Sequence, residues 1–291
     1  MIDYNFYQIT ALTNMHVGSG DANFGVVDNL IQRDPTTNFP YINSSSLKGA
    51  IREFFAYKGL EGNNIEKIFG SSPKASAGGE KSKRQQGMFS FFNAYILSLP
   101  ARSDIIPYFN ATCPQSLNLL LNMYKQINKG RDFKLKEAVN DLLKNLPQKG
   151  TVNISDKFQS DKSENGTVEN LEVESYIKDN LINNELKDLL GNNPAIFNDE
   201  DFSDELAKNL PVIARNHLDN GISENLWYEE IVPRDSRFFF IAGMPPKDDP
   251  LFKKFNETIE SEPVQIGANA SIGYGFCEIK RMELLNGGIK Q

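Results

Sequence analysis

The chain is poor in the residues that most often bind metals or form cross-links. Its 291 residues include 2 cysteines and 2 histidines. Cys113 and Cys277 are too few for a framework of disulfides, and their spacing is not that of a zinc site. His16 and His217 are likewise too few for mechanisms that need a cluster of histidine metal ligands. We therefore expect a protein of a reducing compartment.

Long apolar runs are also missing. The longest apolar stretches, such as Phe238–Ala242, are far shorter than the roughly 20 residues that cross a bilayer. The first twenty residues are interrupted by polar positions and contain no signal-peptide core. These absences predict a soluble, cytoplasmic protein without a membrane partner.

The chain has no excess of positive charge. Lys and Arg number 31 against 38 Asp and Glu, and the resulting net charge of −7 argues against a protein that coats nucleic acid with its whole surface. It does not exclude a local basic groove. With 40% hydrophobic and 24% charged residues, the composition is that of a globular protein with a buried core, and wholesale disorder is excluded.

Hydrophobic periodicity predicts four strands and two helices in the order βαββαβ. The strands are expected at 4–17, 88–99, 237–243 and 275–284, and the helices at 47–58 and 250–260. This order is typical of the ferredoxin-like fold that RNA-recognition modules share, so we expect an α+β protein with such a core.

We expect one domain over 1–291, with its core at about 1–99 and 236–291 and a mainly helical insertion at about 100–235. Inside the insertion, helices are expected at 115–127 and 134–146, and irregular chain at 100–114 and 150–166. Residues 211–215 and 226–232 are expected to form the arms of a β-ribbon around Asp219-Asn220-Gly221.

The segment His16–Gly20 closes the first predicted strand. Gly18 and Gly20, with Ser19 between them, let a phosphate or a base approach the backbone closely. His16 could stack on a base or donate to a phosphate. The ordinary alternatives are a tight exit from the strand and a half-buried histidine with satisfied hydrogen bonds.

A second candidate is the start of the helix expected at 47–58. Ser44, Ser45 and Ser46 offer an N-cap, and their hydroxyls, the helix N–H groups, Lys48 and Arg52 would form an anion site. The alternative is an ordinary capped helix with solvated Lys48 and Arg52.

Two loops add further candidates. Lys81–Arg84 places three positive charges in four residues, which suits a phosphate backbone or a solvated loop. Gln265–Gly275 follows a helix and precedes the last strand, so it is not a dinucleotide-binding fingerprint. Its small residues suit close packing against a sugar–phosphate backbone, although a wide turn would need the same composition.

Asp28 stands between apolar residues in a predicted loop. A functional carboxylate often lies in such a place, but a lone loop aspartate is more commonly a cap or a turn former. From its neighbours alone Asp28 is therefore only a candidate.

Together these segments resemble the RAMP superfamily of CRISPR proteins, whose hallmark is a ferredoxin-like core with a glycine-rich loop before the last strand. His16–Gly20, Gly25–Arg33, Pro40–Arg52 and Gln265–Phe276 look most like the family of the fourth subunit of the Cmr module, the repeated backbone of type III-B effector complexes. The segment Val212–Phe240 is also similar to that family through Trp227, Glu229, Glu230, Pro233 and Arg234.

The resemblance implies a helical filament of copies along a CRISPR guide RNA (crRNA), together with other Cmr-type subunits. Each copy would push a thumb-like β-hairpin, expected at 216–227, across the duplex of guide and single-stranded target RNA and unpair a base at regular intervals. Asp28 matches the family's cleavage aspartate. The candidate RNA-binding residues are His16, Gly18, Ser19, Gly20, Ser45, Ser46, Lys48, Arg52, Gly267, Ser271 and Gly273.

An unpaired nucleotide frees its 2′-hydroxyl to attack the adjacent phosphorus in line. Asp28 would act as general base or hold a hydrated divalent ion, Mg²⁺ or Mn²⁺, that binds with the substrate. Two alternatives stay open. One is a filament scaffold without cleavage, and the other is a stand-alone guide-processing endoribonuclease that uses His16 and His217 as acid and base.

Overall fold

The structure is a computed structural model that describes residues 2–20, 25–60, 62–71, 85–127, 134–147, 151–159, 166–220 and 222–282. Its main sheet consists of β1 (Asp3–Ala11), β2 (Tyr41–Ile42), β3 (Ser90–Phe91), β4 (Ala94–Arg102), β5 (Tyr108–Thr112), β6 (Val152–Ser155), β7 (Thr167–Val168), β8 (Leu171–Ile177), β9 (Pro194–Phe197), β12 (Arg237–Met244), β13 (Val264–Gln265) and β14 (Phe276–Arg281). A separate ribbon is formed by β10 (Val212–Asp219) and β11 (Ile222–Glu230).

The α-helices are α1 (Ser44–Tyr57), α2 (Gly62–Phe69), α3 (Pro114–Ile127), α4 (Lys134–Lys144), α5 (Asn184–Leu190), α6 (Asp199–Asp201) and α7 (Pro250–Ile259). Shorter turns are the 3₁₀ helices η2 (Asp156–Phe158), η3 (Asp179–Leu181) and η5 (Ala270–Ile272) and the π-helix η4 (Phe202–Ala207). Among the residues that the structure describes, no helix is long and apolar enough to cross a membrane.

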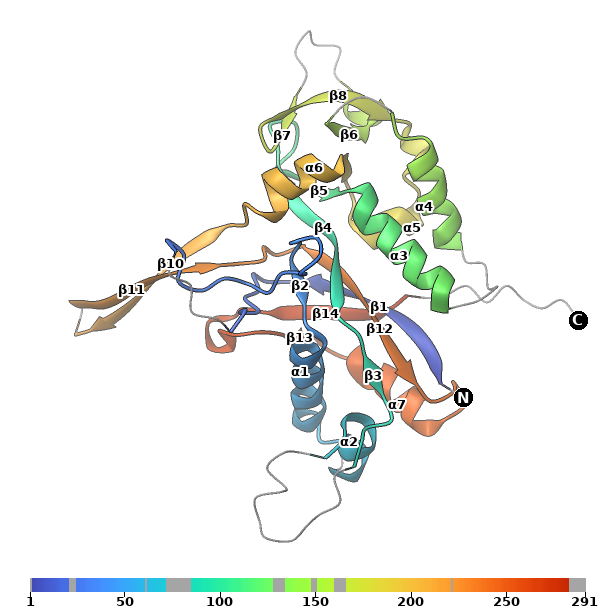
Figure 1. Cartoon of the computed structure of the whole chain (residues 1–291), viewed down its shortest axis with the longest axis vertical. Helices are drawn as coiled ribbons and strands as arrows, with labels where there is room; N and C mark the ends of the chain where they lie inside the picture. The colour runs from blue at the N-terminus through green and yellow to red at the C-terminus, as the bar shows by residue number, and fades with distance from the viewer. Residues whose placement is uncertain are drawn as a thin grey trace, which may run out of the picture.

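The centre of the sheet has the strand order β14–β1–β12–β4, and all three neighbouring pairs are antiparallel. Helices cover both of its faces (Figure 1). Strand β12 shows why: Phe238 and Phe240 pack in one cluster with α1 and α7, while Phe239 and Ile241 pack in a second cluster with α3, α4 and α5. A strand that is buried on both faces appears in the sequence as a continuous apolar run.

Aromatic rings fill the space between this sheet and the helices α1 and α7. The Phe255 ring stacks on that of Phe55 at 5.1 Å and meets the edge of the Tyr7 ring at 6.1 Å. Tyr7 in turn stacks on Phe240 at 5.1 Å. This packing fixes α1 against β1, and so fixes the positions from which the candidate site is built.

The insertion is not mainly helical, contrary to our expectation. It extends the main sheet beyond β4 in the order β5–β9–β6–β8–β7, with α3, α4 and α5 packed beside it. Residues 100–114 contain the end of β4 and all of β5, and the expected loop 150–166 contains β6. These strands are short, and β6 and β9 are buried at every position, so no alternation of polar and apolar residues marks them.

Two boundaries differ from the sequence prediction in ways that affect the site. Strand β1 ends at Ala11 instead of Val17, because Leu12 N and Thr13 N both turn toward Phe276 O, at 2.8 and 3.3 Å. The N-cap of α1 is Asn43 instead of one of the three serines, and its Oδ1 accepts a hydrogen bond from Ser45 N at 2.9 Å. The serines therefore form the first turn of the helix.

The expected ribbon is present, and it projects away from the body of the molecule (Figure 1). Along β11, Leu226 and Tyr228 are 54% and 39% exposed, and Ile222 near the tip is 72% exposed. On β10, Val212 is 45% exposed and pairs with Glu230. Exposed apolar side chains on a projecting ribbon indicate a contact surface.

Candidate nucleic-acid interface

Four segments meet at the base of the ribbon: the exit of β1, residues 25–34 (the Asp28 loop), the start of α1, and residues 265–275 (the glycine loop). Met15 pairs with Val232 just beyond β11, and Gly18 pairs with Ile31 of the Asp28 loop. The glycine loop closes the group through a hydrogen bond from Ala268 N to His16 O at 2.8 Å. Segments far apart in the sequence thus form one surface.

His16 is buried at this junction, with 6% of its surface exposed. Its Nδ1 lies 2.7 Å from Glu230 O, so this nitrogen donates to the ribbon base. His217 lies instead on the ribbon, where its side chain is 66% exposed and 3.9 Å from Glu224. No contact joins the two histidines among the described residues, so the geometry gives no support to a paired histidine acid and base.

The glycine loop needs glycine at two positions where the backbone turns against its neighbours. At Gly267 the φ angle is +93°, and a Cβ there would lie 2.3 Å from His16 O. At Gly275 the φ angle is +77°, and a Cβ would lie 2.1 Å from Ile266 O. Gly273 and Ser271 lie on the exposed side of the same loop. The loop is therefore held tightly on one side and open on the other.

Gln32 connects the exit of β1 to the start of α1, and the sequence analysis missed it. Its Nε2 donates to Gly18 O at 3.2 Å and to Ser46 Oγ at 3.0 Å, while its Oε1 accepts from Asn43 N at 2.7 Å. A single glutamine in a loop has no motif that predicts such contacts. It brings two of the predicted RNA-binding residues, Gly18 and Ser46, to one place.

The other candidates on α1 differ in how free they are. Ser45 is exposed, and its hydroxyl donates to Asn43 Oδ1 at 2.8 Å. Lys48 is half-buried, and its ammonium makes no hydrogen bond or ion pair among the described residues. Arg52 donates to Gly70 O at 2.8 Å, beyond the end of α2. Lys48 is thus available to a ligand, whereas Arg52 already has a structural contact.

The remaining predicted residues are only partly placed. Ser19 is exposed and donates its N–H to Leu30 O at 2.9 Å. Gly20 has a φ angle of +84° with open space around it. The basic loop Lys81–Arg84 lies outside the described residues.

Asp28 is exposed at the base of the ribbon. Its Oδ2 accepts a hydrogen bond from Tyr228 N at 2.7 Å, and Asn29 beside it pairs with Glu229 in parallel fashion. Among the described residues its other oxygen, Oδ1, accepts no hydrogen bond. The carboxylate is therefore fixed in direction by β11 while one oxygen stays open to a ligand. Like a turn former, Asp28 accepts a hydrogen bond from a backbone N–H, but this N–H belongs to Tyr228 of the ribbon and not to a turn of its own loop.

Glu229 joins both strands of the ribbon to the glycine loop. Its carboxylate accepts from Arg215 Nε at 3.0 Å, from Trp227 Nε1 at 2.9 Å and from Asn269 Nδ2 at 2.9 Å. Burial raises the pKa of Glu229, but the hydrogen bonds from Trp227 and Arg215 outweigh it, so its pKa lies below the ordinary value. The charged form of Glu229 is thus the one that ties the ribbon base to the loop.

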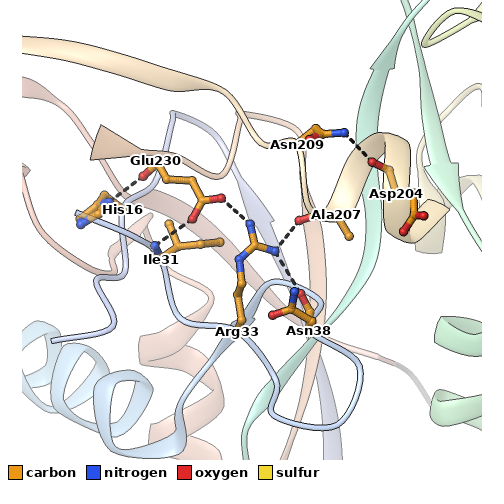
Figure 2. A network of polar contacts seen from close by, with 8 residues as sticks. All are labelled: His16, Ile31, Arg33, Asn38, Asp204, Ala207, Asn209 and Glu230. Atoms are coloured by element: carbon orange, nitrogen blue, oxygen red, sulfur yellow. Dashed lines mark hydrogen bonds and ion pairs between the residues drawn. The ribbon is translucent and has the colours of Figure 1, made fainter. Parts of the chain in front are cut away.

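Glu230 occupies the centre of a second network (Figure 2). Its carboxylate forms an ion pair with Arg33 and accepts from Ile31 N at 3.1 Å. Arg33 also donates to the backbone oxygens of Ala207 and Asn38. The Asp28 loop is therefore tied to the ribbon by side chains as well as by backbone.

The described residues contain no group of three or more His, Cys, Asp or Glu side chains that could hold a metal ion. Asp28 offers one carboxylate, and hard divalent cations need several oxygen ligands. Asp28 would therefore fit Mg²⁺ or Mn²⁺ only as one ligand of an ion that takes its other ligands from bound RNA and water.

Comparisons with known proteins agree with this architecture. The model of the RAMP superfamily matches residues 8–115 and 117–278. The CRISPR system Cmr endoribonuclease Cmr4 of Pyrococcus furiosus is 31% identical over 95% of both chains. The CRISPR system CMR subunit Cmr4 of Saccharolobus solfataricus is 26% identical over 94% of both.

Solved structures show the same fold. A subunit of the type III-B Cmr-beta complex bound to cognate target RNA matches with a TM-score of 0.73 and 22% identity, covering 96% of both chains. Oligomeric Cmr4 from Pyrococcus furiosus matches with a TM-score of 0.69 and 23% identity, covering 98% of this chain and 99% of the other. By the family model and by its relatives, the chain belongs to the RAMP superfamily and, within it, to the Cmr4 family.

Proposed function

We propose that this chain is the repeated backbone subunit of a type III-B CRISPR effector complex and that it cleaves target RNA. The observation that carries the proposal is the position of Asp28, an exposed carboxylate fixed at the base of a projecting ribbon. The relative that is 31% identical is named as a Cmr endoribonuclease, which supports RNA cleavage as the activity.

The fold supports a ferredoxin-like core as the platform for RNA. The order β14–β1–β12–β4, with α1 between β1 and β4 and α7 between β12 and β14, is the order of the βαββαβ pattern. In this arrangement the exit of β1, the start of α1 and the glycine loop lie together at the ribbon base. The ribbon is the thumb in this proposal.

The guide RNA would follow the glycine loop and the start of α1. These segments offer backbone N–H groups and the uncommitted ammonium of Lys48, which suit phosphate groups and do not distinguish bases. A subunit that must accept any guide sequence needs this kind of contact. The partners we propose are crRNA, target RNA, further copies of the chain and other Cmr-type subunits, within the cytoplasm where transcripts are met.

Copies would associate head to tail along the guide. A heterologous contact that does not close into a ring produces a filament whose length is set by its template. The net charge of −7 opposes clustering of free copies, since like charges repel unless RNA-binding surfaces bring the chains into register. We therefore expect the assembled mass to grow in steps with guide length.

The cleavage step requires an unpaired target nucleotide near Asp28. The exposed apolar side chains of the ribbon, Leu226 and Tyr228, would displace one base pair and let the 2′-hydroxyl align with the neighbouring phosphorus. Asp28 would accept the proton of that hydroxyl as its oxygen bonds to phosphorus. The P–O5′ bond then breaks, which leaves a 2′,3′-cyclic phosphate, and the released 5′-oxygen takes a proton from water. In the alternative role, Asp28 and RNA oxygens would together hold a divalent cation, which would neutralise the phosphate charge.

The test is Asp28→Asn in the assembled complex, with Asp249→Asn as a matched control. Asp249 caps α7 through Leu251 N, a role that Asn fills equally well. We expect Asp28→Asn to slow cleavage by a factor of roughly 10²–10⁴ while target affinity stays within a few-fold. Normal cleavage by Asp28→Asn would leave the scaffold without cleavage as the better account. Cleavage that persists in EDTA and needs no guide would favour the stand-alone nuclease.

A further inference from the structure

Arg33 lies near the end of the Asp28 loop, and its guanidinium contacts the end of β11, the π-helix that precedes β10, and Asn38 (Figure 2). Nη2 forms the ion pair with Glu230, which ends β11. Nη1 donates to Ala207 O, at the end of the π-helix that leads into β10, and to Asn38 O at 3.0 Å. The side chains of Arg33 and Glu230 are 17% and 6% exposed, so this pair is largely shielded from water.

Glu230 transmits the position of Arg33 to the loop. Its second carboxylate oxygen accepts from Ile31 N at 3.1 Å, and its own N–H donates to Asn29 O at 2.9 Å. A carboxylate that is held on one side by a guanidinium cannot rotate without losing the hydrogen bond on its other side. Arg33 therefore fixes the N–H of Ile31 through the Glu230 carboxylate, beside the main-chain bond that Glu230 makes to Asn29.

Asp28 lies at the end of this paired segment. Asn29 N donates to Tyr228 O at 3.1 Å, and Asp28 Oδ2 accepts from Tyr228 N at 2.7 Å. Asn29 thus forms a parallel bridge with Glu229 of β11, and the register of this bridge determines where the Asp28 carboxylate points. A change in that register would move Asp28 relative to the ribbon.

We propose that Arg33 is a positioning residue for RNA cleavage, which locks the Asp28 loop to the end of β11 and to the π-helix that leads into β10. The proposal rests on the function proposed above for Asp28. Removal of Arg33 leaves a buried carboxylate without its cation, and such a carboxylate recruits water or a proton and releases its neighbours. A misplacement of about 1 Å at a reacting group costs on the order of 10²-fold in rate.

The experiment measures single-turnover cleavage by the complex assembled with guide RNA at saturating target. We expect Arg33→Ala to cut roughly 10- to 100-fold more slowly, with target affinity within a few-fold of wild type. Millimolar guanidinium should restore much of the rate, whereas methylammonium should not, because only the planar fork reaches several acceptors. A general loss of stability would not respond to guanidinium in this selective way.

Arg102→Ala is the matched control. Arg102 pairs with Glu169 at 3.2 Å in the insertion, but its side chain is 84% exposed. An exposed pair contributes little to stability, so we expect this variant to cut at the wild-type rate. If Arg33→Ala does not fold, Arg33→Lys takes its place, since it keeps the charge but loses the fork, and it should show an intermediate rate.

Amide hydrogen exchange on the isolated chain provides a readout that needs no activity. Arg33→Ala should speed the exchange of the Ile31 and Tyr228 amides, and Arg102→Ala should not. Unchanged exchange, or a wild-type cleavage rate in both Arg33 variants, would overturn the positioning role. A wild-type complex that does not cut at all would instead overturn the proposed function, and faster exchange in Arg33→Ala would still show that Arg33 holds the loop.

Discussion

Two alanine substitutions in the glycine loop test its packed side and its open side separately. Gly267 and Gly273 both have positive φ angles, +93° and +81°. A Cβ at Gly267 would lie 2.3 Å from His16 O and 3.1 Å from Val17 Cγ2, whereas a Cβ at Gly273 would have nothing within 4 Å. The two sites therefore share the backbone cost of a side chain but differ in the contact that the side chain makes.

The magnitudes follow from these geometries. An L-residue in the left-handed region costs about 1–2 kcal/mol, and this should be the whole effect of Gly273→Ala. At Gly267 the new methyl group must displace backbone, which adds about 1–3 kcal/mol for overpacking. In a chain of this size 1 kcal/mol lowers Tm by about 2 °C, so we expect falls of about 2–4 °C for Gly273→Ala and 4–10 °C for Gly267→Ala.

In the Gly273→Ala variant we expect RNA affinity to fall although the protein loses little stability. If the sugar–phosphate backbone packs on the open side of the loop, a methyl group at Gly273 occupies space that the RNA needs. Thermal unfolding and a filter-binding titration with guide RNA test both effects on the same preparations. Equal falls in Tm for the two variants would refute the packing argument. Unchanged RNA affinity in Gly273→Ala would refute close approach of RNA at this point.

Further predictions concern charge and the core. Trp227 is the single tryptophan, and its indole N–H donates to Glu229. The pKa of Glu229 in the folded protein lies below its ordinary value of 4.5. The stability that charged Glu229 contributes is therefore fully present above 4.5 and is lost as the pH falls through the lower folded pKa. Trp227 fluorescence should report this acid step, and Glu229→Gln should abolish the step. Lys48→Glu should reduce the salt dependence of RNA binding, whereas Lys254→Glu, at an exposed position of α7, should not. Phe255→Ala should lower the free energy of unfolding by about 3–5 kcal/mol in a denaturant titration, because the ring is fully buried among aromatic neighbours.

The sequence predicted those parts of the fold that have strong periodicity. Helix α7 has Leu251, Phe252, Phe255 and Ile259 on one stripe, and β12 has an unbroken apolar run, so both were placed within a few residues. The strands β5, β6 and β9 were missed because segments of four or five residues show no clear period. Their partners come from distant segments, and local sequence contains no record of that pairing.

The candidate site was predictable where a motif marked it. The glycine loop, the start of α1 and Asp28 stand out by composition, capping pattern and loop position, and the resemblance to a family adds their roles toward RNA. The structure brings the glycine loop and the start of α1 together with His16 and Gly18. Arg33 and Glu230 were assigned no role, since they are 197 positions apart and each looks like an ordinary charged residue in its own segment. The side chains that orient a site are the hardest to predict, because their contacts exist only after folding.

The most direct test of the central claim is a cut map from complexes that contain a known fraction of Asp28→Asn copies. Each copy is proposed to cut the target next to its own ribbon. The account therefore predicts regularly spaced cuts, each weakened in proportion to the fraction of Asp28→Asn copies, while the amount of bound target stays the same. Cuts that keep full strength at every position, or that all disappear with a small fraction of Asp28→Asn, would contradict it.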